Sequence, residues 1–212
     1  MEKIVLIGGG GHCKVIIDII RMGKKYEILG IIDNNRSGVL GIPVIGKDED
    51  LEKIFLRGVT NAAICVGGLN NPNIRWRIYE HLKGIGFKLP ILIHPKAYVS
   101  DFSKLGEGTC VMAGTMINPE VHVGKINILN TGAIIEHDCE IGDNAHISPG
   151  VVLCGGSNIG CNTQIGANAV VIQGVSIEEN CIIGAGSVVT RDIQVNSIAY
   201  GNPARVTRKN FD

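Results

Sequence analysis

The chain has 212 residues, enough for two domains of modest size, and its 20 Lys and Arg residues balance its 20 Asp and Glu residues. Without a net positive charge, neither a nucleic acid nor an anionic membrane is expected as its partner. Only 4% of the residues are aromatic and 29 are glycines, so we expect many turns around an aliphatic core.

The N-terminal segment and the cysteines indicate a cytoplasmic protein. The opening stretch "MEKIVLIGGGGH" lacks a signal-peptide cleavage site, and no apolar run approaches the length of a membrane span. The 7 cysteines form no CxxC pair, so they predict neither a disulfide framework nor a zinc ribbon.

The first half of the chain alternates strand and helix patterns. Residues 3–7 are almost entirely apolar, as in a parallel strand buried on both faces, and residues 14–22 have a helical apolar face. Two further strands are expected at 28–35 and 61–68, and a second helix at 73–86. This alternation predicts a small Rossmann-like α/β domain, which we assign to residues 1–92.

A glycine loop follows the first predicted strand. A GxGxxG reading from Gly8 reaches Gly10 but then meets Cys13, so the third glycine of the dinucleotide fingerprint is missing. What remains is a turn before a helix N-terminus, which favours anions. His12 and Lys14 beside it can meet phosphate or sugar oxygens, although Lys14 is equally well explained as a solvated helix residue.

The second half of the chain is a six-residue repeat. From Val99 to Val195, all seventeen positions spaced by six are Val, Ile or Leu, and the residue four places after each is mostly small. Neither a helical nor an alternating-strand period holds over this length. A fixed short period marks a solenoid, and a period of six predicts a β-helix with one bulky residue inward per strand.

The repeats "LGEGTC", "IGDNAH", "IGCNTQ", "IGANAV" and "IGAGSV" resemble those of the left-handed β-helix acyltransferases. The resemblance implies three hexapeptides per 18-residue coil and a left-handed parallel β-helix domain with a C-terminal tail over residues 93–212. Together with "IGGGGHCKVIIDII", "GIIDNN" and "GIPVIG", the whole chain is similar to the nucleotide-sugar and sialic-acid acetyltransferases, including the bacillosamine-pathway and perosamine N-acetyltransferases. This subfamily implies acetyl-CoA as co-substrate and a homotrimer with sites between neighbouring β-helices.

The same resemblance assigns residues of the first domain to a nucleotide-sugar site. The glycine loop and its neighbours would line the diphosphate and sugar, the acidic residue after the second strand would face the base or ribose, and a glycine after the third strand would flank it. In order, these residues are Gly10, Gly11, His12, Lys14, Asp33 and Gly67.

His137 is the candidate for chemistry. It comes two residues after the inward Ile135, so it should lie at an outward corner, and the residue one coil further on is Gly155. Histidine suits the role of general base because its ordinary pKa is about 6.5. Asp138 or Glu136 can orient the ring, and a backbone N–H near Gly155 can stabilise the oxyanion. By resemblance, His137 aligns with the catalytic base and Asp138 with its acidic partner.

The resemblance also implies a coenzyme A site. His146 aligns with a histidine near the thioester or pantetheine, and the "GNPAR" turn after the last coil would border the adenine. The expected coenzyme-binding residues are His146, Gly155, Ala167, Ala185, Pro203 and Ala204. Arg205 is either an exposed side chain or a contact to a coenzyme phosphate, and we interpret His122 as structural or solvated.

A metal site was weighed from His122, His137, His146, Cys154 and Cys161 and is not expected, because zinc needs four convergent ligands. The leading hypothesis is an acetyl-CoA-dependent N-acetyltransferase acting on a nucleotide-linked amino sugar, with UDP as the expected nucleotide. The alternatives are O-acetylation of sialic acid or another sugar, a GDP-linked (perosamine-type) amino sugar as acceptor, and a non-catalytic β-helix assembly subunit.

Overall fold

The N-terminal domain is a five-stranded sheet with helices on both faces. The computed structural model describes residues 1–68 and 72–210. Its first strands are β1 (Glu2–Ile7), β2 (Tyr26–Ile32), β3 (Gly38–Val39), β4 (Ile42–Gly46) and β5 (Asn61–Ile64), in the order β3-β4-β2-β1-β5. Only the β3–β4 pair is antiparallel. The expected small parallel α/β domain is confirmed.

Alternate residues of the central strand β1 explain why both faces are covered. Ile4 and Leu6 pack against α1 (Gly11–Gly23), whereas Val5 and Ile7 pack against α2 (Leu51–Leu56) and α3 (Pro72–Ile85). The short helix η1 (Asp48–Asp50) leads into α2. The sequence analysis did not anticipate β3, β4, η1 or α2.

Two expected strands end earlier in the structure than in the sequence pattern. β2 ends at Ile32 because the carboxylate of the next residue, Asp33, accepts backbone hydrogen bonds outside the sheet. β5 ends at Ile64, and only one further N–H, that of Cys65, pairs with β1, at Ile7.

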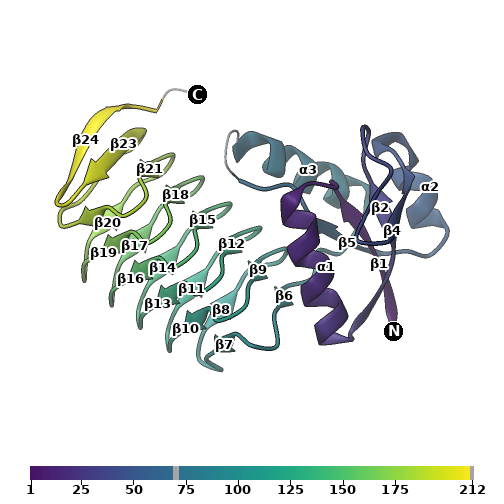
Figure 1. Cartoon of the computed structure of the whole chain (residues 1–212), viewed down its shortest axis with the longest axis horizontal. Coiled ribbons are helices and arrows are strands. Elements are labelled where there is room, and N and C mark those ends of the chain that lie inside the picture. The colour runs from purple at the N-terminus through teal and green to yellow at the C-terminus, as the bar shows by residue number, and fades with distance from the viewer. Residues whose placement is uncertain (69–71, 211–212) are drawn as a thin grey trace.

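The second half forms a left-handed prism of parallel two-residue strands on three faces, running from beside α1 to a C-terminal hairpin at the far end (Figure 1). Face A holds β7 (Tyr98–Val99), β10 (Met116–Ile117), β13 (Ile134–Ile135), β16 (Val152–Leu153), β19 (Val170–Val171) and β22 (Val188–Val189). Face B holds β8 (Lys104–Leu105), β11 (His122–Val123), β14 (Glu140–Ile141), β17 (Asn158–Ile159) and β20 (Ser176–Ile177). Face C holds β6 (Leu92–Ile93), β9 (Cys110–Val111), β12 (Ile128–Leu129), β15 (His146–Ile147), β18 (Gln164–Ile165), β21 (Ile182–Ile183), β23 (Ser197–Gly201) and β24 (Ala204–Lys209).

The register of the prism is 18 residues per coil, as the hexapeptide pattern predicted. Met116 pairs with Ile134, and His146 pairs with Gln164 one coil further on. The aliphatic positions of the repeat are buried from Val111 onward, and the small second positions, such as Thr109 and Ala133, are buried beside the corners.

Each corner of the prism needs one residue in the left-handed backbone region. Every sixth residue from 108 to 186 has φ between +50° and +71°. Most are Gly or Asn, which tolerate this region, and the exceptions are Glu120, Ile126 and Asp138. The turn requirement therefore explains the Gly and Asn positions of the repeat.

The α/β domain packs on face C. Cys110, Met112 and Ile128 share a buried cluster with α1, and Ile126 belongs to the cluster around α2 and α3. β6 spans the domain boundary expected between residues 92 and 93 and pairs with β9, and that boundary stays a prediction.

The corner at Asn180 gives a stability test. We expect Asn180→Ala to lower the free energy of unfolding by about 1 kcal/mol more than Asn180→Gly, because alanine pays the steric cost of the left-handed conformation and glycine does not. Both variants lose the same side-chain hydrogen bonds to Asn196 and Asn210, so their difference in denaturant unfolding isolates the backbone effect. Equal stabilities would contradict this reading of the corners.

Candidate functional site

The glycine loop leaves the N-terminus of α1 open. The Gly9 N–H donates to Asp33 Oδ2 at 2.7 Å, and Gly10, the residue before α1, provides no side-chain cap. A Cβ built on Gly10 or Gly11 would meet no atom within 4 Å. The first-turn N–H groups of α1 therefore border open space, as an anion site requires.

Asp33 braces this loop. Its carboxylate accepts backbone N–H groups from Gly9 and, at 2.8 and 3.1 Å, from Asn35 and Arg36. Burial raises the pKa of Asp33, but the three hydrogen bonds outweigh it and hold the pKa below its ordinary value. A contact between Asp33 and a base or ribose stays a prediction.

His12 lies at the inner end of the loop and is neutral. Burial, followed by the charges of Arg75 and His146, lowers its pKa to about 3. Its Nε2 atom is enclosed and has no partner among the described residues. Gly67 lies beside it, since a Cβ there would be 4.0 Å from the His12 Cβ, whereas Lys14 is exposed on α1.

His146 faces this loop from the prism. It points outward from β15 on face C, and a Cβ built on Gly68 would lie 3.3 Å from its Nδ1 atom. Burial and then Arg75 lower the pKa of His146 to about 4. Within one chain the structure therefore places His146 beside the predicted nucleotide-sugar residues.

His137 and Asp138 form a pair at the corner between faces A and B. The His137 Nδ1 atom lies 2.7 Å from Asp138 Oδ2, and both side chains are 64% exposed. A Cβ built on Gly155 would lie 2.8 Å from His137 Nε2, so the imidazole lies against Gly155 as the coil register predicted. The acidic partner fixes one ring nitrogen and leaves the other for a proton transfer.

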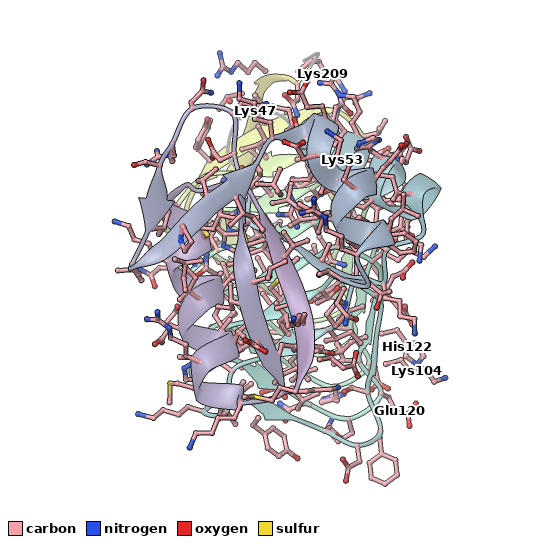
Figure 2. All side chains as sticks on the ribbon, turned by 90° about the vertical axis from the view of Figure 1, so that its right-hand side faces the viewer. Lys47, Lys53, Lys104, Glu120, His122 and Lys209 are labelled. Atoms are coloured by element: carbon pink, nitrogen blue, oxygen red, sulfur yellow. The ribbon has the colours of Figure 1, made fainter. Side chains whose placement is uncertain are left out.

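A second histidine–carboxylate pair lies on face B. His122 Nδ1 is 2.8 Å from Glu140 Oε1, its neighbour one coil further on. Figure 2 shows His122 with Lys104 and Glu120 on the outer flank of the coils beside the α/β domain. The 18-residue spacing between His122 and Glu140 was the signal for this pair, and the sequence analysis did not use it.

The expected coenzyme residues lie on two edges of face A. Gly155 is at the corner between faces A and B, whereas Ala167 and Ala185 are in turns between faces C and A. Pro203 is exposed in the turn between β23 and β24, but Ala204 is buried in the prism core. One chain therefore does not bring this set together, and Ala204 faces the core because the hairpin closes the end of the prism.

Two further searches concern metals and membranes. Across residues 1–68 and 72–210, no group of three or more His, Cys, Asp or Glu side chains is placed to hold a metal ion. In the same ranges, no helix has the length and apolar character needed to cross a bilayer.

Three family profiles match the chain. The PglD N-terminal domain matches residues 3–82, the hexapeptide repeat of succinyl-transferase matches residues 132–163, and the bacterial transferase hexapeptide matches residues 156–191. The first profile covers the α/β domain, and the other two lie within the prism.

Proteins of known structure match along the whole chain. A variant of perosamine N-acetyltransferase from Caulobacter crescentus, in complex with CoA and GDP-perosamine, is 37% identical, with a TM-score of 0.92 over 99% of this chain and 98% of that chain. The acetyltransferase domain of PglB from Neisseria gonorrhoeae, in complex with acetyl coenzyme A, is 34% identical, with a TM-score of 0.88 over 97% of this chain and 99% of that chain.

A curated relative matches over a shorter region. UDP-N-acetylbacillosamine N-acetyltransferase from Bacillus subtilis is 33% identical over 114 residues. This alignment spans 53% of this chain and 52% of the relative, about half of each.

The contact between Gly155 and His137 predicts the effect of one added methyl group. We expect Gly155→Ala to displace the imidazole, because the new Cβ would lie 2.7 Å from His137 Cε1. The ring is exposed and can swing away, so we expect little change in melting temperature but a weaker Nδ1 contact to Asp138. The imidazole Nδ1 resonance by NMR measures this change.

Gly84→Ala on α3 is the matched control, because a Cβ there meets no atom within 4 Å. An unchanged His137 resonance in folded Gly155→Ala would show that the ring does not rest on Gly155.

Proposed function

The chain belongs to the hexapeptide-repeat N-acetyltransferases with a PglD-type N-terminal domain, and from this we propose that it transfers the acetyl group of acetyl-CoA to the amino group of a nucleotide-linked amino sugar. The observation that carries the proposal is the His137 imidazole, oriented by Asp138 and lying against Gly155. The open glycine loop at α1 supports a nucleotide diphosphate as the handle of the acceptor.

His137 is the general base in this proposal. Its Nδ1–H donates to Asp138, so Nε2 accepts a proton from the attacking amine. The amine nitrogen bonds to the thioester carbonyl carbon, and a tetrahedral oxyanion forms. The C–S bond then breaks, and the proton passes from Nε2 to the leaving thiolate. The products are the N-acetylated sugar and CoA, and no acyl-enzyme is formed.

The N–H of Gly155 is the proposed oxyanion donor. It pairs with no backbone carbonyl among the described residues, whereas the next N–H, that of Gly156, donates to the His137 carbonyl at 2.9 Å. A preorganised backbone N–H at this place stabilises charge that develops on the thioester oxygen.

The acceptor site uses the α/β domain. We assign the diphosphate and sugar to the open space at Gly10 and Gly11, with His12 and Gly67 at its inner side and Lys14 at its rim. The nucleotide is the expected UDP or the GDP of the perosamine relative. All seven cysteines are free thiols, which suits a reducing cytoplasm.

The catalytic pair and the acceptor site lie on opposite sides of one prism. His137 is at the corner between faces A and B, whereas the glycine loop lies over face C. A single chain therefore cannot place its own acceptor amine at its own His137. We infer a homotrimer in which each site combines His137 of one chain with the α/β domain of a neighbour, and coenzyme A lies between them.

Face A is the surface proposed to pack in this trimer. Its outward residues are all apolar: Tyr98, Met116, Ile134, Val152, Val170 and Val188. Tyr98 is 50% exposed and Met116 41% exposed. Face B presents polar residues, and the α/β domain covers part of face C, so the apolar column of face A is the surface that association would bury.

The general base is tested by substitution. We expect His137→Ala and His137→Asn to lower kcat by about 10²–10⁴-fold, because the proton acceptor is lost. Melting temperature should stay nearly unchanged, since the side chain is mostly exposed. CoA release from acetyl-CoA is measured with UDP- and GDP-linked amino sugars and with a hydroxyl analogue of each.

His122→Ala is the matched control, because it removes a histidine from a similar carboxylate pair on face B. Wild-type turnover in His137→Ala would refute the assignment. Turnover of the hydroxyl analogue alone would instead support the O-acetyltransferase alternative.

The shared site is tested by mixing two inactive variants. Gly10→Asp places a carboxylate where the diphosphate should bind, and it can still cap α1. His137→Ala removes the base. After subunits are exchanged at equal amounts, we expect about a quarter of wild-type activity, because half of the base positions and half of the loops are intact in random trimers.

No recovery in trimers shown to be mixed would mean that one chain supplies the whole site. A monomer by light scattering would contradict the trimer itself.

A further inference from the structure

Arg75 is a buried cation at the junction of the two domains. Its side chain lies in the first turn of α3 and is 2% exposed. It donates to the carbonyl of Val66 at 2.5 Å, to the carbonyl of Ile126 at 2.6 Å and to Asn144 Oδ1 at 3.2 Å. Among the described residues, no carboxylate forms an ion pair with it. A buried charge held only by neutral acceptors is costly.

The three acceptors belong to the acceptor loop and to two successive coils. Val66 precedes Gly67 and Gly68, the glycines that lie against His12 and His146. Ile126 and Asn144 occupy the corner between faces B and C, one coil apart, and both have positive φ. A buried β-branched residue at φ 50° is sterically unfavourable, so the carbonyl that meets Arg75 is held in a conformation that isoleucine rarely adopts.

The hydrogen bonds around His146 settle which of its ring nitrogens carries the proton. The Thr131 N–H donates to Asn130 Oδ1 at 2.8 Å, which fixes the orientation of that amide. The Asn130 Nδ2 group therefore faces His146 Nε2 at 3.2 Å and donates to it. The proton of the neutral imidazole is then on Nδ1. This Nδ1–H is enclosed beside Gly68 and has no partner among the described residues.

Arg75 also sets the charge state of this region. The titratable groups that face it and His146 are His12 from α1 and the thiols of Cys65 and Cys110 from the two sheets. Burial raises the pKa of both thiols, to about 11 for Cys110, so neither thiol supplies a negative charge near neutral pH. The field of Arg75 is therefore uncompensated by these groups and adds to burial in keeping both imidazoles neutral.

We propose that Arg75 is a positioning residue for the acetyl transfer: it clamps the Val66–Gly68 loop to two coils of the prism and holds His146 as a neutral Nδ1–H donor directed at the bound acceptor sugar. This inference rests on the proposed function, because it takes the acceptor to lie between the loop and face C. An unpaired buried donor costs about 1–3 kcal/mol, and an oxygen of the acceptor would satisfy it.

Two substitutions separate the clamp from the charge. Arg75→Lys keeps the charge, but one ammonium group cannot reach all three acceptors. We expect KM for the sugar nucleotide to rise about tenfold or more through misplacement of the loop, with the His146 titration close to that of the wild type. Arg75→Met removes the charge as well. The pKa of His146 should then rise, and the acid limb of kcat should move to higher pH, because the neutral donor is lost earlier as pH falls.

The readouts are Michaelis parameters against pH and imidazole titrations by NMR. If Arg75→Met does not fold, Asn144→Gly removes one acceptor of the clamp and keeps the left-handed backbone. Asn180→Gly, at the same corner two coils on, is its control. We expect KM to rise in Asn144→Gly and not in Asn180→Gly. Wild-type KM in folded Arg75→Lys, equal KM values in the two glycine variants, or an unchanged His146 titration in Arg75→Met would overturn the proposal.

Failure of the proposed function is recognised separately. Calorimetric titration with UDP and GDP shows whether the wild-type chain binds either nucleotide, and the NMR titrations need no turnover. If neither nucleotide binds, the proposed function fails, while the His146 titration still decides whether Arg75 controls that imidazole.

Discussion

The 18-residue register of the coils is the constraint on which the rest of the structure depends. One aliphatic side chain per strand fills the prism, and one left-handed residue per corner turns the chain. Because the register has no insertion, each residue stacks on the one 18 places away. That stacking brings His137 against Gly155, pairs His122 with Glu140, and aligns Ile126 with Asn144 under Arg75. Contacts within the prism are therefore consequences of a count along the chain.

The same count explains how much of the site could be predicted from the sequence. The aliphatic repeat predicted the prism, and adding 18 to 137 predicted the glycine beside the imidazole. The spacing of nine between His137 and His146 is half a coil, so it also implies that the two histidines lie on different sides. The α/β domain was predictable in outline because its strands are apolar and its helices amphipathic. Short elements such as β3, β4 and α2 lack a long enough pattern to be recognised.

Contacts between the domains could not be predicted in this way. In "NIRWRIY" an arginine resembles any solvated helix residue, and nothing local shows that Arg75 is buried. Its acceptors lie 9, 51 and 69 residues away, and only docking of the α/β domain on face C brings them together. The burial of Ala204 has a similar origin, since the hairpin folds back over the end of the prism. Periodicity predicts what lies within a repeat, but not what a separate domain places on it.

The turn between β23 and β24 is held at a fixed height above His137, and the unit of that height is the coil. Strands of neighbouring coils are spaced by about 4.8 Å, and Gly155 begins the series of coils that separates the imidazole from Pro203. The prism is thus a ruler graduated in steps of 18 residues. Evolution can lengthen or shorten the path between the two ends of a bound cofactor by whole coils. A gain or loss of one residue would instead put inward side chains outside, so such a chain should vary in length by duplication of coils and not by small insertions.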